Sequence, residues 1–208
     1  MFAAALAGQL LVGHQDFNHD QWLHDSASWS LGHYATSSEF WVDVMENWQS
    51  EYLQFSLFIL ATVWLVQRGS TESKPPGSEG GESDEEQRVG RHARRDSPKW
   101  AAAGGWRTTV YSNSLMIVMT LIFLSSWFAQ AVTGRIAYNA EQSDHDAAAV
   151  GLWGYIGSSD FWNRTLQNWQ SEFLAVGSMA ILSVYLRQRG SSQSKPVGSA
   201  HEATGEDG

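Results

Sequence analysis

The pentapeptide Asn47-Trp48-Gln49-Ser50-Glu51 recurs unchanged as Asn168-Trp169-Gln170-Ser171-Glu172. When the chain is shifted by 121 residues, residues 1–77 align with residues 122–198 without a gap, and thirty of these 77 positions are identical. Self-similarity over such a long period is typical of a structural unit that is used more than once. We therefore predict an internal duplication in this chain of 208 residues.

Each copy contains two apolar segments separated by a polar loop of about thirty residues. In the second copy the first apolar segment runs from about Tyr111 to Gly134, longer than the ~20 residues that a helix needs to cross a bilayer. The equivalent segment of the first copy begins at Met1, which aligns with Ile122, so about eleven residues are missing at its start. We expect a native start upstream or a short first helix. A signal peptide is the alternative, but no Lys or Arg precedes the apolar run.

The second helix of each copy is expected over residues 38–69 and 159–190. Ser38 and Ser159 suit the N-cap, because a serine hydroxyl can accept a bond from a free backbone N–H. Gly69 and Gly190 suit the left-handed position that ends many helices.

Eleven Trp residues are many for a chain of this size, and aromatic rings prefer the layer where a membrane meets water. We expect the second helix of each copy to enter lipid near Trp48 or Trp169, with its first two turns above the membrane. The expected interface anchors are Trp41, Trp48, Trp162 and Trp169. The mean hydropathy of -0.29 does not argue against this assignment, because the apolar residues are concentrated in blocks.

The charged and sulfur-containing residues exclude several classes of protein. The chain contains no Cys, which rules out disulfides and thiolate chemistry. The formal net charge is -9, but the acids cluster in residues 79–86 and at the carboxyl end, as they do in solvated segments. Basic residues are few and lie beside apolar segments, so we expect no nucleic-acid partner.

Basic residues also predict the orientation. Lys and Arg follow the second helix of each copy and fill the segment between the copies, whereas the loops within the copies contain only Arg135 and Arg164. Because basic loops mark the cytoplasmic side, we expect a multi-pass protein of the plasma (inner) membrane with both termini and the linker in the cytoplasm.

The expected fold is an all-α membrane protein with about four transmembrane helices, the first of them truncated or starting upstream. It is divided into a first helical hairpin at residues 1–69, a disordered linker at 70–105, a second hairpin at 106–190 and a disordered tail at 191–208. The two hairpins are expected to be parallel repeats, since each contains an even number of crossings.

Polar residues inside apolar helices are costly and usually face a partner or a cavity. Six of them recur at equivalent positions: Gln9 and Gln130, Asn47 and Asn168, and Glu51 and Glu172. One interpretation is an interhelical hydrogen-bond cluster that fixes the register of the helices. The other is a pair of carboxylates lining a path for protons or cations. We favour the cluster, because the helices lack the interruptions typical of midplane binding sites.

The first outer loop is rich in His and Asp, residue types that bind divalent metals. In the second copy only the pair His24-Asp25 has an equivalent, His145-Asp146. No HExxH or comparable spacing appears, so we expect a solvated loop, with no metal and no cofactor.

The duplicated pattern S-S-[ED]-F-W, N-W-Q-S-E-[YF]-L and Q-R-G-S followed by K-P resembles a family of bacterial, mainly actinobacterial, integral membrane proteins of unknown function. The resemblance covers both copies and implies a membrane location and fold, without an activity. Members of that family begin with a complete first helix preceded by basic residues, and this chain departs from the pattern there.

We therefore expect a non-enzymatic, structural or accessory membrane component. Its expected partners are the lipid bilayer and either a second copy of the chain or another membrane protein. Two alternative functions stay open: conduction of protons or cations through Glu51 and Glu172, and metal-dependent catalysis by the outer loop.

Overall fold

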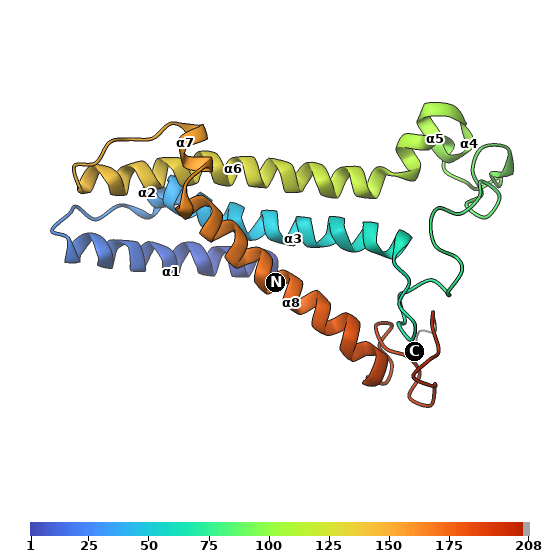
Figure 1. The fold of residues 1–208 in the computed structure, drawn as a ribbon. Helices are drawn as coiled ribbons and strands as arrows, with labels where there is room; N and C mark the ends of the chain where they lie inside the picture. The colour runs from blue at the N-terminus through green and yellow to red at the C-terminus, as the bar shows by residue number, and fades with distance from the viewer. Residues whose placement is uncertain (206–208) are drawn as a thin grey trace. The chain divides into compact units, whose positions relative to one another are not determined.

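The structure is a computed structural model that describes residues 1–205, and none of these residues lies in a β-strand. The helices, with their bounds, are α1 (Phe2–Leu23), α2 (Leu31–Ala35), α3 (Ser38–Trp64), α4 (Lys99–Ala102), α5 (Gly105–Ser112), α6 (Ser114–Asp144), α7 (Leu152–Ile156) and α8 (Ser159–Tyr185), with a short 3-10 helix at Gly90–His92 (Figure 1). The prediction of an all-α fold is confirmed.

Two compact units make up the chain. Unit 1 contains residues 1–50 and 124–168, and unit 2 contains residues 51–123 and those from 169 onward. The boundary crosses α3, α6 and α8, so each of these three helices contributes one part to each unit, whereas α1 lies wholly in unit 1. The sequence predicted a division into consecutive segments that end at residues 69, 105 and 190. This division stays a prediction.

The second helix of each copy begins where the sequence predicted, at Ser38 in α3 and at Ser159 in α8. The capping hydroxyl belongs to the serine before it. In both copies the serine at residue 37 or 158 accepts a bond from the backbone N–H three residues later, at 3.3 Å. The repeated Ser-Ser pair therefore supplies both the cap and the first helical residue.

The prediction that these helices continue to Gly69 and Gly190 is wrong, because α3 ends at Trp64 and α8 ends at an equivalent place. Beyond α3, the N–H of Gln67 donates to the Ser73 hydroxyl at 2.8 Å instead of to a helical carbonyl. Residues 188 and 194 repeat this bond at 2.9 Å. Gly69 and Gly190 have positive φ angles of 85° and 80° and lie in the tight turn that follows.

The first helices, α1 and α6, are longer than expected. Both continue beyond Gly13 and Gly134, so polar residues that the sequence placed in the loops belong to helices. The apolar pattern predicted only the apolar part of each helix and missed the polar part that follows it. The polar part is held by packing against α2 or α7 in unit 1.

Two aromatic clusters form the core of unit 1. In the first copy Tyr34, Phe40 and Val44 are buried beneath side chains of α1. In the second copy Tyr155 and Phe161 are buried with Ala131 of α6. Tyr and Phe at these places are identical in both copies, so the same contacts recur.

Within residues 1–205 one helix, α6, is long and apolar enough to cross a membrane, over residues 114–143, and only 17% of its apolar stretch is buried. The expectation of about four transmembrane helices is thus supported by composition for one helix of the described chain. In α3 and α8 the apolar part is shorter, because Gln and Glu occupy the turn after each Asn-Trp pair.

Candidate functional site

The predicted polar cluster is distributed over both units. Gln130 lies in unit 1 and is fully buried, and its amide donates to the Thr165 hydroxyl at 3.4 Å. The Gln130 Oε1 atom is buried and has no hydrogen-bond partner among the described residues. Its equivalent in the first copy, Gln9, is exposed on α1.

The two Asn residues bond within their own helices. The amide of Asn47 donates to the Asp43 carbonyl at 2.7 Å, and the amide of Asn168 donates to the Arg164 carbonyl at 2.9 Å. These bonds attach each Asn side chain to the preceding turn of its own helix. Both Asn residues belong to unit 1.

The two recurring carboxylates lie beyond that boundary, in unit 2. Glu51 is exposed on α3, and Glu172 is half-buried on α8. The structure therefore places Glu51 and Glu172 in a different unit from Gln130, Asn47 and Asn168.

The predicted interface anchors differ in their surroundings. The Trp41 indole is exposed and donates to the Ala35 carbonyl at 3.0 Å, and Trp162 is similarly exposed. The Trp48 ring lies 6.1 Å from the ring of Phe2 in unit 1. In unit 2 the ring of Trp169 lies 6.4 Å from that of Phe173.

The repeated His-Asp pairs end α1 and α6. Asp25 and Asp146 have left-handed φ angles of 53° and 55°. Around Asp25 the N–H of Ser26 bonds to the Gln21 carbonyl at 2.8 Å, and the N–H of Asp25 bonds to the Trp22 carbonyl at 3.2 Å, as in a Schellman motif. The second copy repeats both bonds. Asp tolerates this backbone conformation better than most residues, which gives the repeated pair a structural role.

His24 and His145, the other members of these pairs, are both exposed. A side-chain nitrogen of His24 bonds to the Asp20 carbonyl at 2.8 Å, which also closes the end of α1. Among the described residues, no group of three or more His, Asp or Glu side chains is placed to hold a metal ion.

An ion-pair cluster around Arg164 was not among the predicted sites. Its guanidinium lies 3.6 Å from a carboxylate oxygen of Asp43, 3.3 Å from Glu46 and 3.5 Å from Asp160. All four residues belong to unit 1 and come from α3 and α8. The cluster therefore joins the amino-terminal parts of the second helices of the two copies.

The sequence contains a signal that could have identified this pairing. Arg164 and Asp43 occupy equivalent positions in the two copies, so the duplication places opposite charges at the same place on each second helix. Opposite charges at equivalent positions favour a contact between the two second helices, whereas like charges would oppose it.

Acids outnumber the single arginine in this cluster. Burial raises the pKa of Asp43 and of Glu46 above the ordinary carboxyl value, and the Arg164 charge opposes this shift. Burial and the nearby Asp43 carboxylate raise the pKa of Glu39 in the same way.

The Tyr155 hydroxyl donates to Asp160 at 2.8 Å. Burial, and to a smaller extent this bond, raises the pKa of Tyr155. The arrangement can hold α3, α7 and α8 together.

One family matches nearly the whole chain: a family described as "Domain of unknown function (DUF6766)", which matches residues 1–206. The chain belongs to this family. No curated protein and no solved structure matches the chain.

Proposed function

We propose that this member of the DUF6766 family is a multi-pass protein of the plasma (inner) membrane with a structural or accessory role and no enzymatic activity. The observation that supports membrane insertion best is the run of large apolar side chains exposed on the long helices. Leu174 of α8 is 65% exposed, Phe128 of α6 is 61% exposed and Leu60 of α3 is 46% exposed. Such surfaces are unfavourable in water and suited to lipid.

Aromatic residues at the ends of the apolar parts support the same proposal for α3 and α8. Trp48 and Trp64 flank the apolar part of α3, and Trp169 and Tyr185 occupy the equivalent positions in α8. At 1.5 Å per residue each pair is separated by roughly 24 Å along the helix, which is slightly less than the ~30 Å hydrocarbon core. Aromatic rings at both ends are typical of membrane-spanning helices.

The structural role is supported by the use that the chain makes of its repeated polar residues. Asn18 forms two bonds with the backbone of Trp29, at 2.7 and 3.0 Å. Asn139 forms the same two bonds with the backbone of Val150, at 2.9 and 3.0 Å. The repeated Ser-Ser, His-Asp and Gln-Arg-Gly-Ser segments likewise form caps and turns. These residues are explained by folding and need no reaction to account for them.

The absence of Cys makes the topology directly testable. We propose single substitutions at Ser28 and Ala148 in the two loops, and at Ala103 and Ser192 in the linker and tail, each to Cys. In intact cells a membrane-impermeant maleimide should label only the Ser28→Cys and Ala148→Cys variants. The other two should react only after the membrane is opened. Equal labelling of all four variants in intact cells would reject the multi-pass topology.

A further inference from the structure

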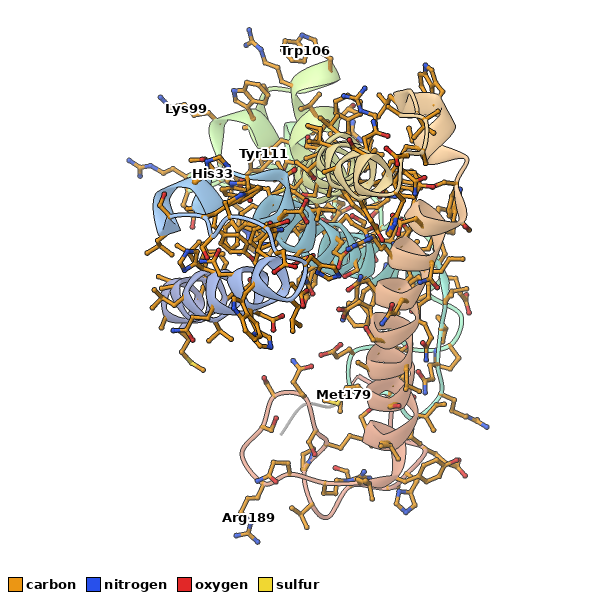
Figure 2. All side chains as sticks on the ribbon, turned by 90° about the vertical axis from the view of Figure 1, so that its left-hand side faces the viewer. His33, Lys99, Trp106, Tyr111, Met179 and Arg189 are labelled. Carbon is orange, nitrogen blue, oxygen red and sulfur yellow. The ribbon has the colours of Figure 1, made fainter. Side chains whose placement is uncertain are left out.

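Unit 2 contains an apolar groove of about 730 Å³ that the predicted sites do not include. Its walls are the carboxyl-terminal parts of α3 and α8, with Phe55, Phe58 and Ala61 on one side and Val176, Met179 and Ala180 on the other. Met179 projects from the side of α8 (Figure 2). This volume lies within the ~300–1,000 Å³ typical of small-molecule sites.

One end of the groove is polar. It is lined by residues 67 and 70–73 after α3 and by Gln193 after α8. The amide of Gln67 crosses from the end of α3 to the Ala180 carbonyl at 2.9 Å. The groove therefore combines apolar walls with a hydrogen-bonding end, as a site for an amphiphile requires.

Two arginines follow the helices that form the groove. Arg68 and Arg189 occupy equivalent positions in the two Gln-Arg-Gly-Ser turns, and both are exposed. Arg189 extends outward from the chain (Figure 2). Neither guanidinium forms an ion pair with a residue that the structure describes. These two arginines lie in the turns that border the polar end and do not line the groove itself, whose lining includes one acid, Glu72.

We propose that the groove binds one acyl chain of an anionic glycerophospholipid of the cytoplasmic leaflet, with the phosphate near Arg68 and Arg189. This inference rests on the proposed membrane insertion. The groove walls belong to the apolar parts of α3 and α8, which then lie at the depth of the hydrocarbon. Apolar walls do not retain water, so a hydrocarbon chain is the occupant that fits them. Basic side chains at the membrane surface favour anionic headgroups.

The test is native mass spectrometry of the full-length protein, extracted from membranes in mild detergent and exposed to equal amounts of phosphatidylglycerol and phosphatidylcholine. The wild-type protein should retain one phospholipid, with phosphatidylglycerol preferred. Ala61→Trp and Ala180→Trp, which fill the groove, should each abolish retention. Leu121→Trp places the same bulk on an exposed position of α6 outside the groove and should leave retention unchanged.

A second pair of substitutions tests the headgroup without changing the groove. Arg68→Gln together with Arg189→Gln should keep one bound phospholipid but lose the preference for phosphatidylglycerol, by about fivefold for each arginine. Equal retention by wild type and both Trp variants, or an unchanged preference in the Arg variant, would overturn the inference. A wild-type chain that is absent from the membrane fraction would instead overturn the proposed function.

Discussion

Gly13 and Gly134 are equivalent residues, and each lies against a tyrosine hydroxyl in unit 1. A Cβ atom on Gly13 would lie 2.6 Å from the Tyr34 oxygen, and one on Gly134 would lie 2.4 Å from the Tyr155 oxygen. Any larger residue would displace the buried ring. These glycines therefore allow the close approach of α1 to α2 and of α6 to α7.

We predict that Gly13→Ala lowers the free energy of unfolding by about 1–3 kcal/mol, because the added methyl group forces the Tyr34 ring to move. Tyr34→Phe removes the contacting oxygen and should restore most of the loss in the double variant. Gly8→Ala is the matched control in the same helix, since no atom lies within 4 Å of its added Cβ. It should be neutral or stabilising by up to about 1 kcal/mol. Chemical denaturation in detergent measures all four, and equal losses in the two alanine variants would contradict the steric explanation.

The carboxylates around Arg164 predict the dependence of stability on pH. Burial raises the pKa of Asp43 and Glu46 in the folded protein. The folded state then holds protons more tightly than the unfolded chain, so stability falls as pH rises from the ordinary carboxyl pKa of about 4 through the raised values.

We expect the thermal midpoint of the wild-type protein to decline over that window, and Asp43→Asn to make the decline smaller. Glu85→Gln, in the exposed linker, is the control and should keep the wild-type slope. Thermal scans from pH 4 to 7 measure the effect. A wild-type slope that Asp43→Asn leaves unchanged would show that this carboxyl does not contribute.

At the scale of the helices, α3 and α8 are joined by the charges at equivalent positions 43 and 164. Reversing one charge places like charges together, whereas reversing both restores an attractive pair. Asp43→Arg should therefore lower the free energy of unfolding by about 0.2–1 kcal/mol, the range of a partly exposed ion pair, because the two side chains lie 3.6 Å apart and are 37% and 49% exposed. Asp43→Arg combined with Arg164→Asp should recover part of this loss. If the double variant lost more free energy of unfolding than the two single variants together, the result would argue against the pairing.

The two turns after α3 and α8 are built alike but end differently. Lys74 donates to the Gly80 carbonyl at 2.9 Å, and Lys195 donates to the equivalent carbonyl of His201 at 2.7 Å. Lys195 is also fully buried and donates to the Gly69 carbonyl at 2.7 Å. The second lysine thus connects the tail after α8 to the turn after α3.

This connection predicts the effect of removing one ammonium group. Lys195→Met should speed hydrogen exchange at the amides of Gly69 and Gly205, which donate to the Thr204 hydroxyl and the Ser70 carbonyl between the turn after α3 and the tail. Lys74→Met removes the equivalent group of the first copy and should leave those two amides unchanged. Amide exchange read by mass spectrometry provides the comparison. Identical exchange in the two variants would contradict this role of Lys195.

At the scale of the whole molecule, the proposed structural role and conduction give different results in reconstituted vesicles. We expect no proton or cation flux above that of empty vesicles. Glu51→Gln with Glu172→Gln should then change neither flux nor the amount of inserted protein. A wild-type flux that this double variant abolishes would instead establish conduction through the two carboxylates.

How far the sequence predicts this protein differs from feature to feature. The all-α class and the starts of α3 and α8 followed from apolar blocks and the repeated serines. The ends of α3 and α8 did not, because Ser73 and Ser194 take the backbone N–H groups that a longer helix would use. Among the site residues, Gln130 was predicted to belong to a polar cluster, which stays a prediction, and its hydrogen bond to Thr165 could not be inferred from the sequence.

The amino-acid sequence alone determined the self-similarity over 121 residues, the helical class and the starts of α3 and α8 at the repeated Ser-Ser pairs. These depend on bonds between residues a few positions apart, so the local pattern contains the information. Only the tertiary structure decided that Arg164 meets Asp43 and Glu46, that Gly134 fits under Tyr155, and that unit 2 contains an apolar groove. These depend on which distant side chains become neighbours, and the polarity of a single residue does not specify its neighbour.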